Sequence, residues 1–344
     1  MRRGRRALAW LTLVALSHAP IVSADPQPLT FADIPGWAED DHRAALAAFV
    51  ASCPTLTDPA WQAACAAAPE ETDARGFFER YFRPSLVGQG KPTLFTGYYE
   101  PEIAASPVPT ARFAYPIYRT PPELHPGAVW FDRETIESQG LLQGRGLELA
   151  WLADPVDVFF LQIQGSGRLL MPDGHIMRVG FAAKNGQPYH SVGMELVRRG
   201  LYTAAQVSAR TIRNWVHANP EAGRELLWTN PSFIFFRKVN VPAALGPLGA
   251  LHLPVTPGRS LAVDPKVVPL GAPVWVDTTG NPPLHRLMVA QDIGTAIKGP
   301  GRADVFIGSG FRAGEIAGRM RDHGHMIVLL PVDRVEAALP REPE

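Results

Sequence analysis

The sequence predicts a mainly β protein with N-terminal helices, in which a compact β-barrel carries a group of acids. Three short apolar runs between residues 261 and 310 each end or begin at an aspartate: Asp264, Asp292 and Asp304. Runs of Val, Ile, Leu and Phe this short, bounded by Gly and Pro, indicate strands and leave no room for a long helix. Amphipathic or aromatic-faced helical patterns come earlier in the chain, at residues 40–52, 59–68 and 70–82.

The three aspartates are candidates for a chemical site. Strand ends of one barrel would bring their carboxyl groups together, and like charges at short range cannot all ionise easily. At least one should then have a raised pKa and hold a proton near neutral pH, as a general acid requires. Each aspartate alone has another explanation, because Asp at a strand end often bonds to nearby backbone in a turn. Three in one segment favour a site.

Composition sets the outer limits. A chain of 344 residues, 46% of them apolar, can bury a substantial core and suggests two domains, although one large β domain would also fit. Lys plus Arg equals Asp plus Glu, at 33 each, so the formal net charge is zero. This balance gives no electrostatic footprint for nucleic acid.

Residues 1–24 have the three parts of a secretory signal: a basic start, an apolar core at 7–16, and small residues before Asp25. We expect cleavage after Ala24, which would leave the mature protein in the periplasm. Association of the mature protein with the outer membrane stays open. The apolar core is too short for a stable membrane anchor. No cysteine lies in the leader to accept a lipid, and its arginine pairs leave the twin-arginine export route open beside the general one.

The chain has two cysteines, Cys53 and Cys65, twelve positions apart. In an exported protein such a pair forms a disulfide more often than a metal site, which would need further ligands. His323 and His325 have no Cys or acid at metal-ligand spacing, so we expect no metal and no cofactor.

Several polar and aromatic residues are candidates for binding a sugar. Tyr99 and Glu100 lie in a predicted strand that starts at residue 93, where an aromatic face and a carboxylate suit a pyranose, although such a pair is common in ordinary strands. Residues 101–126 are rich in proline and are expected to cross into a second domain. Lys184 and Tyr189, around an Asn-Gly turn signal, complete the group.

Residues 156–167 are predicted to form a strand of this second domain. Gln162 and Gln164 alternate there with aliphatic residues, which would place both amides on one face. Amide groups donate and accept hydrogen bonds and suit hydroxyl and N-acetyl groups. A solvated polar face is the alternative explanation.

Six segments together carry a resemblance to a known family. These are TGYYEPEI, FFLQIQGSGRL, KNGQPYHSVG, NPSFIFF, LAVDPKVVPLG and MVAQDIGTAIKGPGRADVFIGSG. In this order they resemble the membrane-bound lytic murein transglycosylase A (MltA) family, and the last segment resembles the domain named for three aspartates (3D). The resemblance covers residues 96–332.

The resemblance implies a double-psi β-barrel domain with a second β domain inserted, and a substrate groove between them. The expected division is a signal peptide at 1–24, barrel residues at 25–105, the insert at 106–245, the rest of the barrel at 246–335 and a tail at 336–344. It also implies that Asp304 is the catalytic residue and that Asp292 and Asp264 support it. Family members described as membrane-bound carry a lipidated leader cysteine, and this chain departs from them there.

The implied activity is that of a peptidoglycan lytic exotransglycosylase, a lyase that acts on glycan strands. It cleaves the β-1,4 bond between N-acetylmuramic acid and N-acetylglucosamine and leaves 1,6-anhydromuramic acid ends. A monomer is expected, with other cell-wall enzymes as candidate partners. Two alternatives stay open: a hydrolytic muramidase with Asp292 or Asp264 as base, and a non-catalytic peptidoglycan-binding module.

Overall fold

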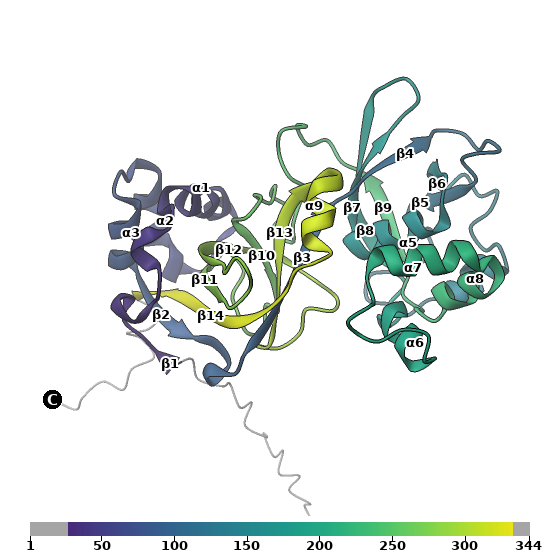
Figure 1. The fold of residues 1–344 in the computed structure, drawn as a ribbon. Helices are drawn as coiled ribbons and strands as arrows, with labels where there is room; N and C mark the ends of the chain where they lie inside the picture. The colour runs from purple at the N-terminus through teal and green to yellow at the C-terminus, as the bar shows by residue number, and fades with distance from the viewer. Residues whose placement is uncertain (1–26, 333–344) are drawn as a thin grey trace, which may run out of the picture.

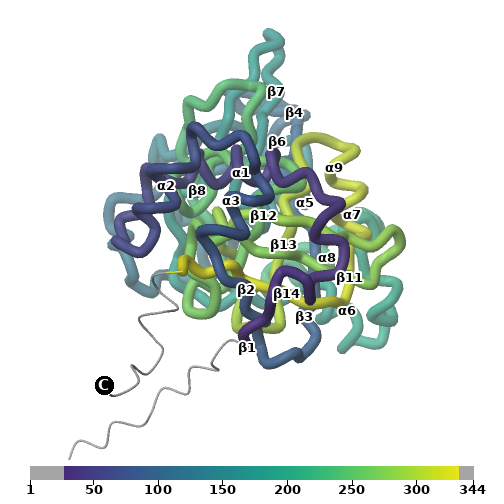
Figure 2. Tube along the Cα trace, turned by 90° about the vertical axis from the view of Figure 1, so that its left-hand side faces the viewer, coloured from purple at the N-terminus to yellow at the C-terminus, as the bar shows by residue number. Residues whose placement is uncertain are grey.

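The computed structural model describes residues 27–332, which form two β-sheets and the helices around them. The expected leader and C-terminal tail lie outside the described residues. Figure 1 shows the two sheets side by side, with helices α1 to α3 at the end of the first sheet that is remote from the second. Figure 2 looks onto this end. No helix within residues 27–332 is long and apolar enough to cross a membrane.

Six strands of the first sheet close into a barrel, because β14 pairs with β11 on one side and with β3 on the other. The barrel strands are β3 (Thr93–Glu100), β10 (Ser260–Val263), β11 (Pro273–Thr278), β12 (His285–Ile293), β13 (Arg302–Ser309) and β14 (Arg321–Pro331). Two short strands, β1 (Gln27–Pro28) and β2 (Phe82–Leu86), extend the sheet beyond β14. The prediction of a mainly β protein with a barrel and a second β domain is confirmed.

Three N-terminal helices pack on the barrel: α1 (His42–Ser52), α2 (Gln62–Ala67) and α3 (Ala74–Tyr81). Asp41 and Asp73 begin α1 and α3 as N-caps, each accepting a backbone N–H of the first turn. Phe49 of α1 and Trp275 of β11 are fully buried in one core shared by the helices and the barrel. Cys53, just after α1, and Cys65, in α2, form a disulfide that ties these two helices together.

The second sheet has the strand order β5-β6-β4-β7-β8-β9. Its strands are β4 (Glu102–Ser106), β5 (Tyr115–Tyr118), β6 (Glu148–Leu152), β7 (Ser166–Leu170), β8 (Ile176–Lys184) and β9 (Ile234–Lys238). Its helices are α4 (Arg133–Ser138), α5 (Pro155–Gln164), α6 (Val192–Arg198), α7 (Ala209–Ala218) and α8 (Pro220–Trp228). Residues 101–126 therefore hold two strands, β4 and β5, and are not the plain crossing segment that their prolines suggested.

The predicted strand at residues 156–167 is wrong, because most of it is helix α5. The Asp154 side chain caps the helix by accepting the N–H of Val156, Pro155 occupies its first turn, and Gly165 ends it with a φ of 75°. The alternation of the two glutamines with aliphatic residues extends over only a few positions, which does not distinguish a strand from a helix. The apolar residues of α5 are buried against two separate cores. Gln162 and Gln164 consequently do not share a strand face.

Candidate active site

Two of the three predicted aspartates lie close together on neighbouring barrel strands. β10 runs between β12 and β13, and its Ala262 is the register partner of both Asp292 and Asp304. Residues paired in this way point to the same face, so the two carboxyl side chains flank the small Ala262 side chain. Two strand spacings put their Cα atoms about 10 Å apart. A β-bulge beside Ala262 sets this register on the β12 side.

The two faces of these strands have different roles. Leu261, Val263 and Val305 alternate with the site residues and lie in the barrel core. On the site face, β3 runs parallel to β13 and places Thr96 opposite Asp304 and Tyr98 opposite Phe306. This face of the barrel thus places Thr96 and Tyr98 beside the two acids.

Asp304 lies in an environment that favours the protonated form of its carboxyl group. Burial raises its pKa to about 6, and the charge of Asp292 acts in the same direction. The hydroxyl of Thr96 donates to its Oδ1 at 2.8 Å, and Arg302 donates to the same Thr96 oxygen at 3.2 Å. Thr96 and Arg302 both oppose the pKa rise. Among the described residues no group donates to the second oxygen, Oδ2.

Asp292 has its two oxygens fully engaged. The backbone N–H groups of Ala250 and Ile293 donate to Oδ1 at 3.1 and 2.9 Å, and the hydroxyl of Tyr98 donates to Oδ2 at 2.9 Å. Burial raises its pKa to about 6, and all three donors oppose that rise. Burial and the neighbouring Asp292 also raise the pKa of Tyr98 well above its ordinary value, so this hydroxyl stays a donor.

The expected third member, Asp264, does not join this pair. Its side chain accepts the N–H groups of Gly299 at 2.8 Å and Lys266 at 3.1 Å. The bond from Gly299 is the main reason that its pKa lies below the ordinary value. Asp264 therefore plays the turn role that was the alternative for each aspartate, and it holds the loop between β12 and β13 to the end of β10.

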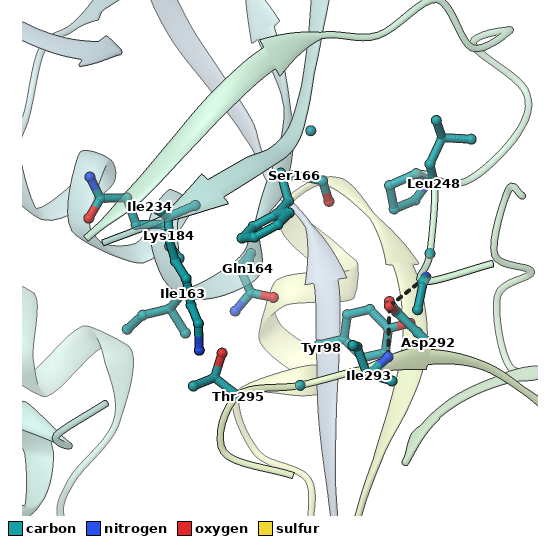
Figure 3. A pocket seen from close by; sticks show the side chains of 18 of the residues that line it. Tyr98, Ile163, Gln164, Ser166, Lys184, Ile234, Leu248, Asp292, Ile293 and Thr295 are labelled. Atoms are coloured by element: carbon teal, nitrogen blue, oxygen red, sulfur yellow. Dashed lines mark hydrogen bonds between the residues drawn. The ribbon is translucent and has the colours of Figure 1, made fainter. Parts of the chain in front are cut away.

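A cleft between the barrel and the second sheet contains the site. A cavity of about 470 Å³ is lined by Tyr98 and Asp292 from the barrel and by residues of α5, β7, β8 and β9. A smaller one of about 160 Å³ contains Asp304 and Arg302. Both are lined by Gln162, Ile163, Ile234, Gly294 and Thr295, so they are adjoining parts of one cleft. Figure 3 shows Tyr98 and Asp292 on one side, with Gln164, Ser166 and Lys184 across from them.

Four of the predicted sugar-binding residues line this cleft. Gln162, Gln164 and Lys184 border the larger cavity, and Tyr189 borders the smaller one. Gln162 is buried and accepts a hydrogen bond from Arg133, whose guanidinium also donates to two backbone carbonyls. The Gln164 side-chain oxygen accepts the N–H of Tyr99 at 3.1 Å. The glutamines face the cleft from the end of a helix, which still leaves their amide groups at its wall.

The other two candidates point away from the cleft. Successive residues of a strand face opposite sides, so Tyr98 borders the cavity while the ring of Tyr99 packs beside Gly314 of α9 (Gly310–Ala317). Glu100 is 1% exposed and accepts hydrogen bonds from Arg178 at 2.7 Å, Arg168 at 2.8 Å and Ser309 at 2.8 Å. The Glu100 carboxylate therefore binds groups inside the protein and does not face the cleft.

This Glu100 cluster joins the two domains at their connections. Glu100 is the last residue of β3, directly before the chain enters the second sheet, and Arg168 and Arg178 come from β7 and β8. The same two guanidinium groups donate to backbone carbonyls between residues 241 and 245, on the return to the barrel. The cluster therefore fixes how the two walls of the cleft meet.

The sequence reasoning missed Thr96, Arg302 and Phe181 as site residues. Thr96 and Tyr98 alternate along β3 with buried Phe95. This alternation indicates that both face the site once the pairing of β3 with β13 is known. Phe181 of β8 lines the larger cavity and is 49% exposed. Within residues 27–332, no group of three or more His, Cys, Asp or Glu is placed to hold a metal ion.

Two carboxyl groups with raised pKa values, held on a barrel in a cleft between two β domains, define a site for acid–base chemistry. The family model for the MltA specific insert domain matches residues 94–237, and that for the 3D domain matches residues 259–330. The chain is 35% identical over 244 residues to membrane-bound lytic murein transglycosylase A of Vibrio cholerae, which covers 68% of this chain and 64% of the relative. The chain belongs to the membrane-bound lytic murein transglycosylase A family.

Other relatives and solved structures agree with this assignment. A homolog from Buchnera aphidicola is 32% identical, with 76% of this chain and 72% of the homolog covered. A membrane-bound lytic murein transglycosylase from Agrobacterium tumefaciens superposes with a TM-score of 0.82 at 33% identity, covering 90% of this chain and 99% of that one. MltA of Escherichia coli with bound chitohexaose gives a TM-score of 0.69 at 29% identity, covering 85% and 90%. The alignments to the Vibrio and Escherichia curated relatives span slightly less than two thirds of their length.

Proposed function

We propose that the protein is a lytic transglycosylase of the cell envelope that acts on peptidoglycan. It would cleave the β-1,4 bond between N-acetylmuramic acid and N-acetylglucosamine and form 1,6-anhydromuramic acid ends. Support comes from family membership, from the cleft with its two acids, and from the chitohexaose bound to the Escherichia coli relative. The glycan strand would lie along the cleft, and a periplasmic monomer remains our expectation.

The observation that carries the assignment of the acid is the difference between the two carboxyl groups. Asp292 accepts three hydrogen bonds spread over both oxygens, an arrangement that favours its carboxylate form. Asp304 accepts one from described residues, on Oδ1. Its Oδ2 is available to carry a proton and to give it to a ligand in the smaller cavity.

The reaction would use Asp304 twice. Its proton passes to the glycosidic oxygen as the bond to C1 of the muramyl ring breaks, and an oxocarbenium-like centre develops there. The Asp304 carboxylate then takes the proton of the muramyl C6 hydroxyl while that oxygen bonds to C1. The product is a 1,6-anhydro sugar, and no water is consumed.

One carboxyl group suffices because the attacking hydroxyl belongs to the reacting sugar. A tethered nucleophile has an effective concentration far above that of an external one. Asp292 would support the acid through its charge, which raises the pKa of Asp304. Thr96 and Arg302 would stabilise the carboxylate that forms after the first proton transfer.

The test compares Asp304→Asn with Asp292→Asn on purified sacculi. The Asp304 variant should release no soluble fragments while it still sediments with the sacculi, since its side-chain oxygen can still accept from Thr96. The Asp292 variant should retain measurable release. Full activity in Asp304→Asn would overturn the assignment of the acid, and loss of sacculus binding in both variants would indicate that folding is damaged.

A further inference from the structure

Three cationic side chains line the larger cavity of the cleft and have no ion-pair partner within residues 27–332. Lys184 ends β8, Arg237 lies near the end of β9, and Lys298 is in the loop between β12 and β13. All three are exposed, and none forms an ion pair with another described residue; Lys298 only lies near enough to Asp264 to lower its pKa. Figure 3 shows Lys184 reaching across the cleft toward Thr295 of that loop.

The charge of this cavity differs from that of the whole chain. Asp292 is the single acid among its described lining residues, against Lys184, Arg237 and Lys298. The chain as a whole has a formal net charge of zero. A cleft lined by an excess of one sign concentrates the field and attracts ligands of the opposite sign.

A glycan chain of neutral sugars carries no charge for this field to attract, whereas a muramyl strand carries carboxylates. The lactyl group on C3 of muramic acid ends in a carboxyl group, which is either free or amide-linked to a stem peptide with carboxylates of its own. We infer that Lys184, Arg237 and Lys298 bind the carboxylates of muramyl substituents along the cleft. This inference rests on the proposed function, and it names the feature by which the cleft distinguishes peptidoglycan from chitin.

The spacing of the cations fits a repeating anion better than a single small one. Lys184 pairs with Ile234, and Arg237 lies three residues further along β9, opposite Gly180. Three strand residues correspond to about 10 Å and reverse the side-chain direction across the edge strand β9, so the two side chains do not share one carboxylate. Muramic acid is every second sugar of the strand, so its carboxylates recur along the cleft.

The wall between the cations is suited to the sugar itself. Phe181 presents an exposed ring, and Gln164 and Ser166 present uncharged polar groups to the same cavity. Aromatic faces and amides bind a pyranose whether or not it has an acidic substituent. Neutral contacts and carboxylate contacts can therefore be separated by mutation.

The experiment measures binding with three probes to full-length mature protein carrying Asp304→Asn, so that no probe is cut. The probes are chitohexaose, stem-free murein glycan strands and stem-bearing strands. The test variant adds Lys184→Gln, Arg237→Gln and Lys298→Gln. The matched control adds Lys91→Gln, Arg210→Gln and Lys238→Gln, which remove the same charges from exposed positions outside the described cavities.

The test variant should bind the muramyl strands about tenfold more weakly, because each exposed charge contact is worth about a two- to fivefold change. Its Kd for chitohexaose should be unchanged, and the control should match the parent on all three probes. Weakening confined to stem-bearing strands would identify stem carboxylates as the ligand, and weakening confined to stem-free strands would identify the lactyl group. Weakening on both would mean that the subsite accepts either source.

The inference is overturned if chitohexaose binding weakens equally, if the control weakens as much as the test variant, or if nothing changes. Salt gives a second readout, since raising it from about 0.01 M to about 1 M shortens the screening length from about 30 Å to about 3 Å. The parent's Kd for muramyl strands should rise with salt more steeply than that of the test variant. Digestion of sacculi by the wild-type protein reports the activity separately, so strands that bind but are not cut would refute the proposed function and keep the subsite.

Discussion

Replacing Asp304 by Asn should stabilise the fold while it abolishes activity. The wild-type carboxyl group has its pKa raised from 3.8 to about 6, chiefly by burial, so the folded state disfavours its ionisation. Asn has the same shape, keeps an oxygen to accept from Thr96 and never ionises. The variant therefore removes the cost of holding this group in the cleft and leaves the barrel packing intact.

The sign and size of this stability change follow from the pKa of Asp304 in the folded protein and in the unfolded chain. Between pH about 4 and about 6 the unfolded chain loses the Asp304 proton while the folded protein keeps it, so the wild-type stability falls as pH rises through this window. About two pKa units correspond to about 3 kcal/mol. Because the side chain borders a cavity and is only partly buried, we expect a gain of about 1–3 kcal/mol for the variant above pH about 6, and almost none below about 4.

Urea unfolding of both proteins at several pH values measures this difference. The stability gap should open as pH rises from about 4 to about 6 and stay constant above that. A gap that is the same at every pH would mean that the carboxyl group titrates normally in the fold. A variant less stable than wild type at neutral pH would refute the account of Asp304 as a carboxyl group whose pKa is raised by burial.

Three other predictions concern the acid's neighbours and the framework. Activity should fall above pH about 6, where Asp304 loses its proton. In kcat/KM profiles, Arg302→Gln should move this limb to higher pH and Asp292→Asn should move it to lower pH, and shifts of the same sign would refute the electrostatic account. Cys53→Ser should lower the free energy of unfolding by about 3 kcal/mol with activity retained at 25 °C, and an unchanged urea midpoint would contradict it. Glu100→Gln should lower the free energy of unfolding by about 3–5 kcal/mol, because it removes the buried carboxylate that pairs with Arg168 and Arg178. The control Glu102→Gln, at the exposed end of the same cluster, should lower it by at most about 1 kcal/mol. Equal losses in the two variants would argue against the domain-joining role.

Local sequence was sufficient for the barrel strands and for two of the acids. The runs ending at Asp292 and starting at Asp304 are short, β-branched and bounded by Gly and Pro, and their strand character does not depend on distant partners. The resemblance to a family then favoured a site over turn residues for all three aspartates, which spacing alone had left open. Asp264 is the exception, since its sequence context matches the others but its side chain binds loop N–H groups and borders neither cavity of the cleft.

The remaining errors arise where tertiary contacts decide the type of an element or the direction of a side chain. The alternation of Gln162 and Gln164 with aliphatic residues favours a strand at 156–167, whereas the cap residues at the two ends of α5 indicate a helix. Tyr98 and Tyr99 are adjacent and chemically alike, and only the pairing of β3 with β13 determines which one faces the cleft. Glu100 resembled a sugar ligand because its partners, Arg168 and Arg178, lie 68 and 78 positions away.

The measurement that tests the central claim most directly is mass spectrometry of the muropeptides released from purified sacculi, with borohydride treatment to mark reducing ends. The wild-type protein should release products that resist reduction and weigh one water less than hydrolytic products, because the C6 hydroxyl takes the place of water. Reducible products would contradict the intramolecular mechanism and identify a muramidase. Sacculus binding without any released product would leave only a binding module.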